Sequence, residues 1–163
     1  MHYLFVDRKG AVAIWGLISR VAESLLARGD RVTFCRLDDG RRHPSTDEPD
    51  GVLLRDVAVP PKRHPWELIV QQRTFARRFA ELLKELRPDV VHTNFCVPGV
   101  VARATAGRLA VPVVVSTQHE LYGSMHPHYR WSVLWTRRRA RTTVHISNAV
   151  ARSFGLSPPT LDE

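Results

Sequence analysis

Short apolar runs alternate along the chain with longer stretches whose apolar residues recur at helical spacing. The short runs predict strands over residues 3–6, 31–37, 52–59, 89–93, 111–117 and 142–146. The longer stretches predict helices over about residues 14–28, 65–87, 98–109 and 128–141, with a last helical turn over 147–153. This alternation predicts right-handed crossovers and a doubly wound parallel sheet, which is a Rossmann-like α/β fold.

Two segments refine this picture. The run VPVVVST at 111–117 is apolar at consecutive positions, which is typical of a central parallel strand with helices over both faces. The final stretch GLSPPTLDE is rich in turn formers, so we expect one domain over residues 1–155 and a linker or tail over 156–163. In such sheets ligands bind at the carboxyl ends of the strands, and candidate site residues are sought there.

The composition is that of an ordinary globular protein. Of 163 residues, 44% are hydrophobic and 25% are charged, which excludes a disordered tail, a collagen-like repeat and a disulfide scaffold. No apolar run approaches the roughly 20 residues that span a bilayer, and the first residues lack the basic start of a signal peptide. Cys35 and Cys96 are isolated, which favours a reducing compartment. The expected location is therefore the cytoplasm.

The charge is basic, with 24 Lys and Arg against 16 Asp and Glu and a net charge of +8. Nucleic acid, a phosphorylated substrate and an acidic membrane face are all compatible with this excess. An arginine-rich composition without a binding role is the alternative, and only the placement of the arginines separates these interpretations.

Several common motifs are missing from the sequence. It contains no GxxxxGK[ST] loop, no GxGxxG after the first strand and no GxSxG nucleophile elbow. The acidic pair and lysine of a response-regulator receiver are also missing. His126 and His128 flank a proline without nearby carboxylate or cysteine ligands, so no metal site is expected there.

Four segments in order resemble a known family. They are RVAESLLARGDRVTFC at 20–35, RPDVVHTNF at 87–95, VPVVVSTQHE at 111–120 and HISNAVARSFG at 145–155. Their order and spacing are similar to those of the N-terminal, acceptor-side domain of GT-B glycosyltransferases of the retaining family-four type. The resemblance covers residues 1–155, nearly the whole chain.

The resemblance implies an activity that needs a second domain. A GT-B enzyme transfers a sugar from a nucleotide sugar to a hydroxyl acceptor in the cleft between two Rossmann-like domains. Here the nucleotide sugar is a substrate and no cofactor is implied. Most donor contacts lie in the C-terminal domain, so a shortened chain, a truncated gene product and a half-enzyme with a separate donor-binding chain are the three explanations. The resemblance predicts negligible transfer by this chain alone.

The resemblance also implies site residues. His119 follows the fifth strand and corresponds to a histidine beside the reacting sugar, which makes it the candidate catalytic residue. Thr93 and Asn94, at the mouth of the fourth strand, are candidates for hydrogen bonds to acceptor hydroxyls. Glu120 is a further substrate-binding candidate that would support His119, with a solvated side chain as the alternative. Gly10 is a candidate for close approach to donor phosphate. A solvated loop at Gly10 and a histidine that bonds only backbone are the alternatives.

Three departures from the family pattern affect the first loop and the fourth strand. The family has two adjacent glycines after the first strand, whereas Gly10 and Gly16 stand apart here. Asp30 and Asn94 each replace a histidine of the family pattern. These changes weaken the implied sugar or phosphate contact at the first loop.

Residues 126–141 combine aromatic residues with arginines. Trp131 and Trp135 beside Arg137, Arg138 and Arg139 are typical of a helix that lies on an anionic membrane surface. A sugar or lipid-linked acceptor and a peripheral position on the inner membrane face would fit this interpretation. The alternative is a helix whose tryptophans pack on the sheet while its arginines are solvated.

A function of another class also fits the fold. A non-catalytic basic α/β module could bind nucleic acid or a protein partner. Its basic residues are spread over several predicted helices, and no RNA-binding aromatic motif is present, which disfavours nucleic acid.

Overall fold

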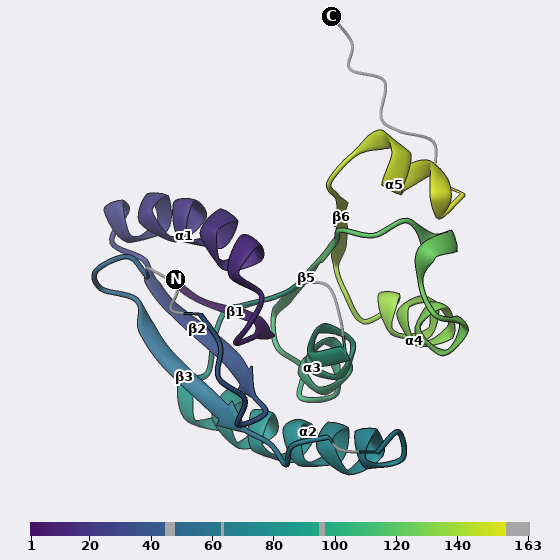
Figure 1. Ribbon diagram of the computed structural model, residues 1–163. Coiled ribbons are helices and arrows are strands. Elements are labelled where there is room, and N and C mark those ends of the chain that lie inside the picture. The colour runs from purple at the N-terminus through teal and green to yellow at the C-terminus, as the bar shows by residue number, and fades with distance from the viewer. Residues whose placement is uncertain (45–47, 63, 95–96, 156–163) are drawn as a thin grey trace, which may run out of the picture.

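The computed structural model describes residues 1–44, 48–62, 64–94 and 97–155. These residues form one parallel sheet of six strands in the order β3-β2-β1-β4-β5-β6 (Figure 1). The strands are β1 (His2–Arg8), β2 (Arg31–Asp38), β3 (Leu53–Ala58), β4 (Val90–Thr93), β5 (Val113–Gln118) and β6 (Thr142–His145). The predicted doubly wound, Rossmann-like α/β fold is confirmed.

Helices cover both faces of the sheet. They are α1 (Val12–Ala27), α2 (Glu67–Leu86), α3 (Val97–Arg108), α4 (Pro127–Arg137) and α5 (Asn148–Ser153), with a 3-10 turn at Tyr122–Ser124. Figure 1 shows α1 and α5 on one face, and α2, α3 and α4 on the other. Among the described residues, no helix is long and apolar enough to cross a membrane.

Alternate residues of β1 enter two separate apolar cores. Leu4 and Val6 pack toward α2 and α3, where the rings of Phe75 and Phe79 stack 5.5 Å apart. Phe5 packs toward α1 with the second core, whose buried members are Trp15, Ile18, Ala22, Leu25, Val32 and Phe34. The side chains of β1 are therefore buried on both faces of the sheet, as expected of an interior parallel strand.

The expectation of a central strand at 111–117 is wrong. β1 and β4 occupy the middle of the order, while β5 lies next to the edge strand β6. Val114 is buried toward α3, but Val113 and Val115 are only half-buried on the other face. Among the described residues, the helices over that face are α1 and α5, and α1 packs on the β2 side of the sheet. An apolar run predicts a strand with neighbours on both sides, but it does not give the strand's rank in the sheet.

The element ends are set by local chemistry. α2 ends at Leu86, and its C-cap residue Arg87 adopts a left-handed conformation (φ 45°) just before Pro88. The predicted cap at Ser147 is confirmed, since its Oγ accepts from the backbone N–H of Val150. α4 ends at Arg137, four residues before the predicted end. The expected tail at 156–163 and Cys96 lie outside the described residues.

A buried guanidinium ties α4 to the rest of the fold. Arg103 of α3 is 1% exposed and donates to Thr136 Oγ1, to Ser116 Oγ and to the Val133 carbonyl. Burial lowers the pKa of Arg103 to about 10, so the side chain remains charged at neutral pH. These bonds fix the position of α4 against α3 and β5.

Candidate functional site

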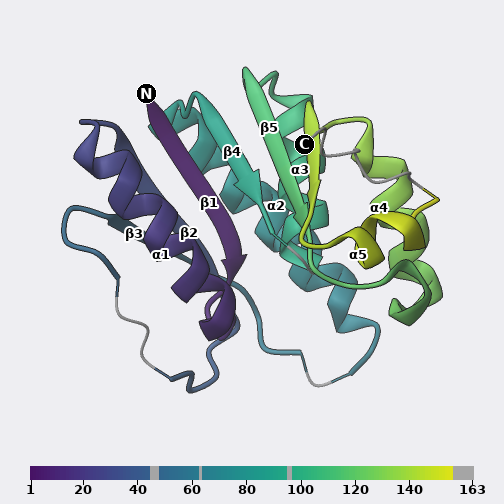
Figure 2. The same cartoon turned by 90° about the horizontal axis from the view of Figure 1, so that it is seen from above.

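The carboxyl ends of β1, β4 and β5 bring polar side chains together on the face that carries α1. Figure 2 shows the arrowheads of β1 and β4 at the same edge of the sheet. Val6 of β1 pairs with Thr93 of β4, so the next residues on the two strands, Asp7 and Asn94, lie beside each other at this edge. Strand alternation places Asp7, His92, Asn94, Thr117 and His119 on the same face. We call these five residues the carboxyl-end cluster.

His119 is joined to Asn94 within this cluster. The His119 Nε2 lies 3.4 Å from the Asn94 Oδ1. Because a carbonyl oxygen only accepts, the ring donates from Nε2. Burial lowers the pKa of His119, so the imidazole is neutral at pH 7 and its Nδ1 is an acceptor. The ring can thus receive a hydrogen bond from a ligand hydroxyl.

His92 supports the cluster from the adjacent strand position. Its Nε2 lies 2.7 Å from Thr117 Oγ1, and its ring centroid is 5.2 Å from that of Phe5. Burial, with a smaller contribution from the charge of His119, lowers the pKa of His92 to about 4. The neutral His92 ring therefore packs on Phe5 and links β4 to β5 through Thr117.

Asp7 is a cluster member that the sequence interpretation missed. Its carboxyl group is fully buried at the end of β1, and burial raises its pKa to about 7. Its Oδ1 accepts from the Arg8 backbone N–H at 2.6 Å. Among the described residues, Asp7 Oδ2 and Asn94 Nδ2 are buried without hydrogen-bond partners. The one available signal in the sequence was a carboxylate that ends an apolar strand.

The other expected site residues lie apart from this cluster or beside it. Thr93 is fully buried on the opposite face, where its Oγ1 donates to the Val115 carbonyl at 3.2 Å. Gly10 lies against the loop after β2, because a Cβ there would come within 2.5 Å of His43 Nδ1. Glu120 is half-buried and directly follows His119. The structure therefore brings together Asn94 and His119, but not Thr93.

The lysine of the first loop is engaged by carboxylates. Lys9 Nζ lies 2.7 Å from Asp38 Oδ2 and 2.8 Å from Asp56 Oδ2. These bonds raise the pKa of Lys9 and hold the loop after β1 against β2 and β3. In this arrangement Lys9 is a structural cation rather than a free phosphate ligand.

Gly99 at the start of α3 sets the position of Asn94. A Cβ at Gly99 would lie 1.9 Å from the Asn94 carbonyl oxygen, closer than any real contact. The first turn of α3 can therefore sit over the end of β4 only with glycine at this position.

We expect Gly99→Ala to lower the free energy of unfolding by roughly 1–3 kcal/mol, the usual range for overpacking. Gly16→Ala is the matched control, because Gly16 lies within α1 and its Cβ would meet no atom within 4 Å. There alanine should raise stability by roughly 0.5–1 kcal/mol through helix propensity. Urea denaturation of both variants measures the two changes, and a loss at Gly16 or a gain at Gly99 would contradict this account.

Metal-ligating side chains do not cluster in the part of the chain that the structure describes. No group of three or more His, Cys, Asp or Glu residues there could hold a metal ion. The rings of His126 and His128 lie 5.0 Å apart at the start of α4.

Comparison with known families gives one match over most of the chain. The family model described as "Glycosyl transferase 4-like domain" matches residues 15–157. No curated protein sequence matches the chain significantly.

Solved structures with this fold include sugar-nucleotide enzymes. A UDP-GlcNAc 2-epimerase from Neisseria meningitidis, solved with bound UDP-GlcNAc, is 13% identical with a TM-score of 0.69 over 94% of this chain and 42% of its own. The lipopolysaccharide outer core galactosyltransferase WaaB is 14% identical with a TM-score of 0.66, over 100% of this chain and 50% of its own. MurG from Acinetobacter baumannii is 13% identical with a TM-score of 0.57, over 91% and 41%. The chain thus spans half or less of each of these proteins.

Proposed function

Because the chain belongs to the family of glycosyl transferase 4-like domains, we propose that it is the acceptor-binding half of a retaining glycosyltransferase. In this proposal a sugar moves from a nucleotide sugar to a hydroxyl group of a sugar or lipid-linked acceptor. The fold is that of an N-terminal GT-B half, since its neighbours are GT-B proteins of which it matches 41–50%. A donor-binding domain or separate chain would supply the rest of the site.

The observation that carries this proposal is the pairing of His119 with Asn94 at the carboxyl edge of the sheet. A hydroxyl group both donates and accepts. The neutral His119 ring has an acceptor in Nδ1, because its bond to Asn94 Oδ1 keeps the proton on Nε2. The pair therefore offers one oriented acceptor to an acceptor hydroxyl.

His119 would then act on the acceptor hydroxyl as the sugar is transferred. A neutral imidazole that accepts from the hydroxyl orients its oxygen and can take up charge as the proton leaves. Asp7, whose pKa lies near neutrality, is the second proton-accepting group of the cluster. Thr93 has no part in this arrangement because its hydroxyl is bonded on the other face.

Donor binding would depend on the other half of the enzyme. The first loop offers no free lysine, since Lys9 is held by two aspartates. The sequence also contains neither a P-loop nor a dinucleotide fingerprint. We therefore assign the diphosphate of the donor to residues outside this chain.

Calorimetric titration of the 163-residue chain with UDP- and GDP-sugars tests whether donor binding depends on residues outside this chain. We expect no binding tighter than about 1 mM, which corresponds to about −4 kcal/mol. Stoichiometric binding in the micromolar range would show that this chain contains the donor site, and would contradict its assignment as the acceptor-side half.

A further inference from the structure

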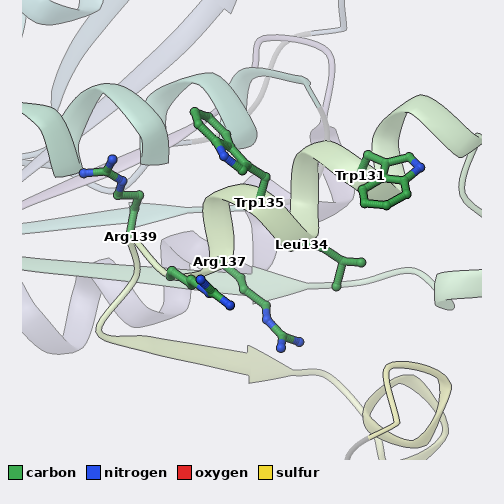
Figure 3. A pocket seen from close by; sticks show the side chains of 6 residues that line it. Trp131, Leu134, Trp135, Arg137 and Arg139 are labelled. Carbon is green, nitrogen blue, oxygen red and sulfur yellow. The ribbon is translucent and has the colours of Figure 1, made fainter.

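The tryptophans of α4 are not part of the core. Trp131 is 76% exposed and Trp135 is 72% exposed, whereas the buried residues of α4 are Val133 and Thr136. Four-residue spacing places the two indoles on one side of the helix. Figure 3 shows both rings standing off α4, with Arg137 and Arg139 at and beyond its C-terminal end. The interpretation in which these tryptophans pack on the sheet is therefore wrong.

The apolar surface continues from α4 onto α2. Trp135 lines one shallow hollow together with Ile69 and Arg73 of α2 and Arg108 of α3. Ile69 and its neighbour Val70 are each more than half exposed. We call the surface formed by α4 and the adjoining parts of α2 and α3 the Trp–Arg face. Its members are Trp131, Leu134, Trp135, Arg137, Arg138 and Arg139, with Ile69, Arg73 and Arg108 at its edge.

The charge on this face has one sign. Neither α3 nor α4 contains an aspartate or glutamate. From residue 90 to residue 161 the sequence has eight arginines and a single acidic residue, Glu120. In the described parts of the chain, no arginine of the Trp–Arg face forms an ion pair, unlike Lys9 and Arg36 on the other half of the sheet. These guanidinium groups are therefore available to an external anion.

The combination of exposed tryptophans with arginines outside ion pairs favours a lipid surface over other anionic partners. At the headgroup level of a bilayer, phosphates lie within reach of guanidinium groups while an apolar boundary lies just beneath for indole rings. Duplex nucleic acid supplies the phosphates but no apolar layer for Trp131, Leu134 and Trp135. The Trp–Arg face presents both chemistries side by side on a helix that Arg103 holds in place.

We propose that the Trp–Arg face docks the protein onto an anionic lipid bilayer, with Trp131 and Trp135 at the headgroup boundary and Arg137, Arg138 and Arg139 on lipid phosphates. This inference does not depend on sugar transfer. It would place the sheet beside a membrane in which a lipid-linked acceptor could reside.

Cosedimentation of the full chain with vesicles tests the proposal. One set contains phosphatidylglycerol mixed with phosphatidylcholine, and the other contains phosphatidylcholine alone. We expect binding to the anionic vesicles that weakens as salt rises, because exposed charges are screened over about 8 Å at physiological ionic strength. The triple change of Arg137, Arg138 and Arg139 to Gln should lower the partition coefficient about a hundredfold.

A charge-matched control separates a docking face from general basicity. Arg20, Arg31 and Arg42 are exposed and lie outside the Trp–Arg face, and their change to Gln removes the same three charges. This control should lose far less binding than the patch variant. Trp131→Ala with Trp135→Ala should also weaken binding, and circular dichroism should show an unchanged fold because both rings are exposed.

Three results would overturn the proposal. One is equal loss of binding in the two arginine variants, which would indicate a non-specific charge effect. Another is the absence of binding to anionic vesicles at low salt. The third is binding of an oligonucleotide, but not of vesicles, that the patch variant loses, which would identify nucleic acid as the partner of this face.

Discussion

Asp7→Asn is expected to raise the free energy of unfolding at pH 8 by up to about 4 kcal/mol. Burial raises the pKa of Asp7 to about 7 in the folded state, against an ordinary value near 4 in the unfolded chain. At pH 8 the wild-type carboxylate is ionised while buried, with its Oδ2 unpaired among the described residues. Asparagine has nearly the same shape and carries no charge, so the change removes this cost.

The sign of the effect follows from proton binding. Between pH 4 and pH 7 the folded state holds a proton on Asp7 that the unfolded state has lost, so wild-type stability falls as the pH rises through this window. The gain from Asp7→Asn should therefore be largest at pH 8 and vanish near pH 3. Chemical denaturation of both proteins across this range measures the difference.

Asp38→Asn is the control of opposite sign. The hydrogen bond from Lys9 lowers the pKa of Asp38. Loss of the Asp38 carboxylate should therefore decrease the free energy of unfolding at pH 8. If the Asp7 variant gained the same stability at every pH, or lost stability at pH 8, Asp7 would not be a buried carboxylate that titrates near neutrality.

The sequence was sufficient for the strands and the fold class, because strand-length apolar runs and helical periodicity alternate without interruption. It did not give the rank of β5, since its apolar side chains look the same in the centre of a sheet and next to its edge. The position of a strand in the sheet depends on which strands pair and on which face each helix packs. No proline or glycine marks the early end of α4 at Arg137, and the Arg141 backbone N–H already donates to the Val114 carbonyl as the chain enters β6.

Some site residues could be predicted from the sequence and others could not. Thr93 and Asn94 are neighbours in sequence, and strand alternation sends their side chains to opposite faces, so only Asn94 could join His119. Asp7 was missed because its chemistry arises from burial and from an unpaired oxygen, and neither is visible in a sequence. The exposure of Trp131 and Trp135 was also undecided, since one helical pattern fits both a packed and a solvent-facing side.

His119→Ala is expected to lower kcat for sugar transfer roughly 30- to 1,000-fold, which is a loss of about 2–4 kcal/mol of transition-state stabilisation. The reason is the loss of the acceptor atom Nδ1 that would hold the reacting hydroxyl, together with the partner of the Asn94 amide. The ring is half-buried and lies at the edge of the sheet, so its removal should disturb folding much less than transfer.

His128→Ala is the matched control for this variant. His128 is an exposed histidine on α4, outside the carboxyl-end cluster, and its replacement should leave kcat within about twofold of the wild type. Equal stability of the two variants in urea would confirm that any difference in turnover arises at the site.

The most direct measurement is transfer of a labelled sugar by a two-domain protein in which this chain is followed by a donor-binding domain of the family. Wild type, His119→Ala and His128→Ala are compared in that protein, with the 163-residue chain assayed alone beside them. The account predicts turnover by the wild type and the His128 variant, a 30- to 1,000-fold lower kcat for the His119 variant, and none by the chain alone. Turnover by the chain alone, or an unchanged kcat after loss of His119, would contradict it.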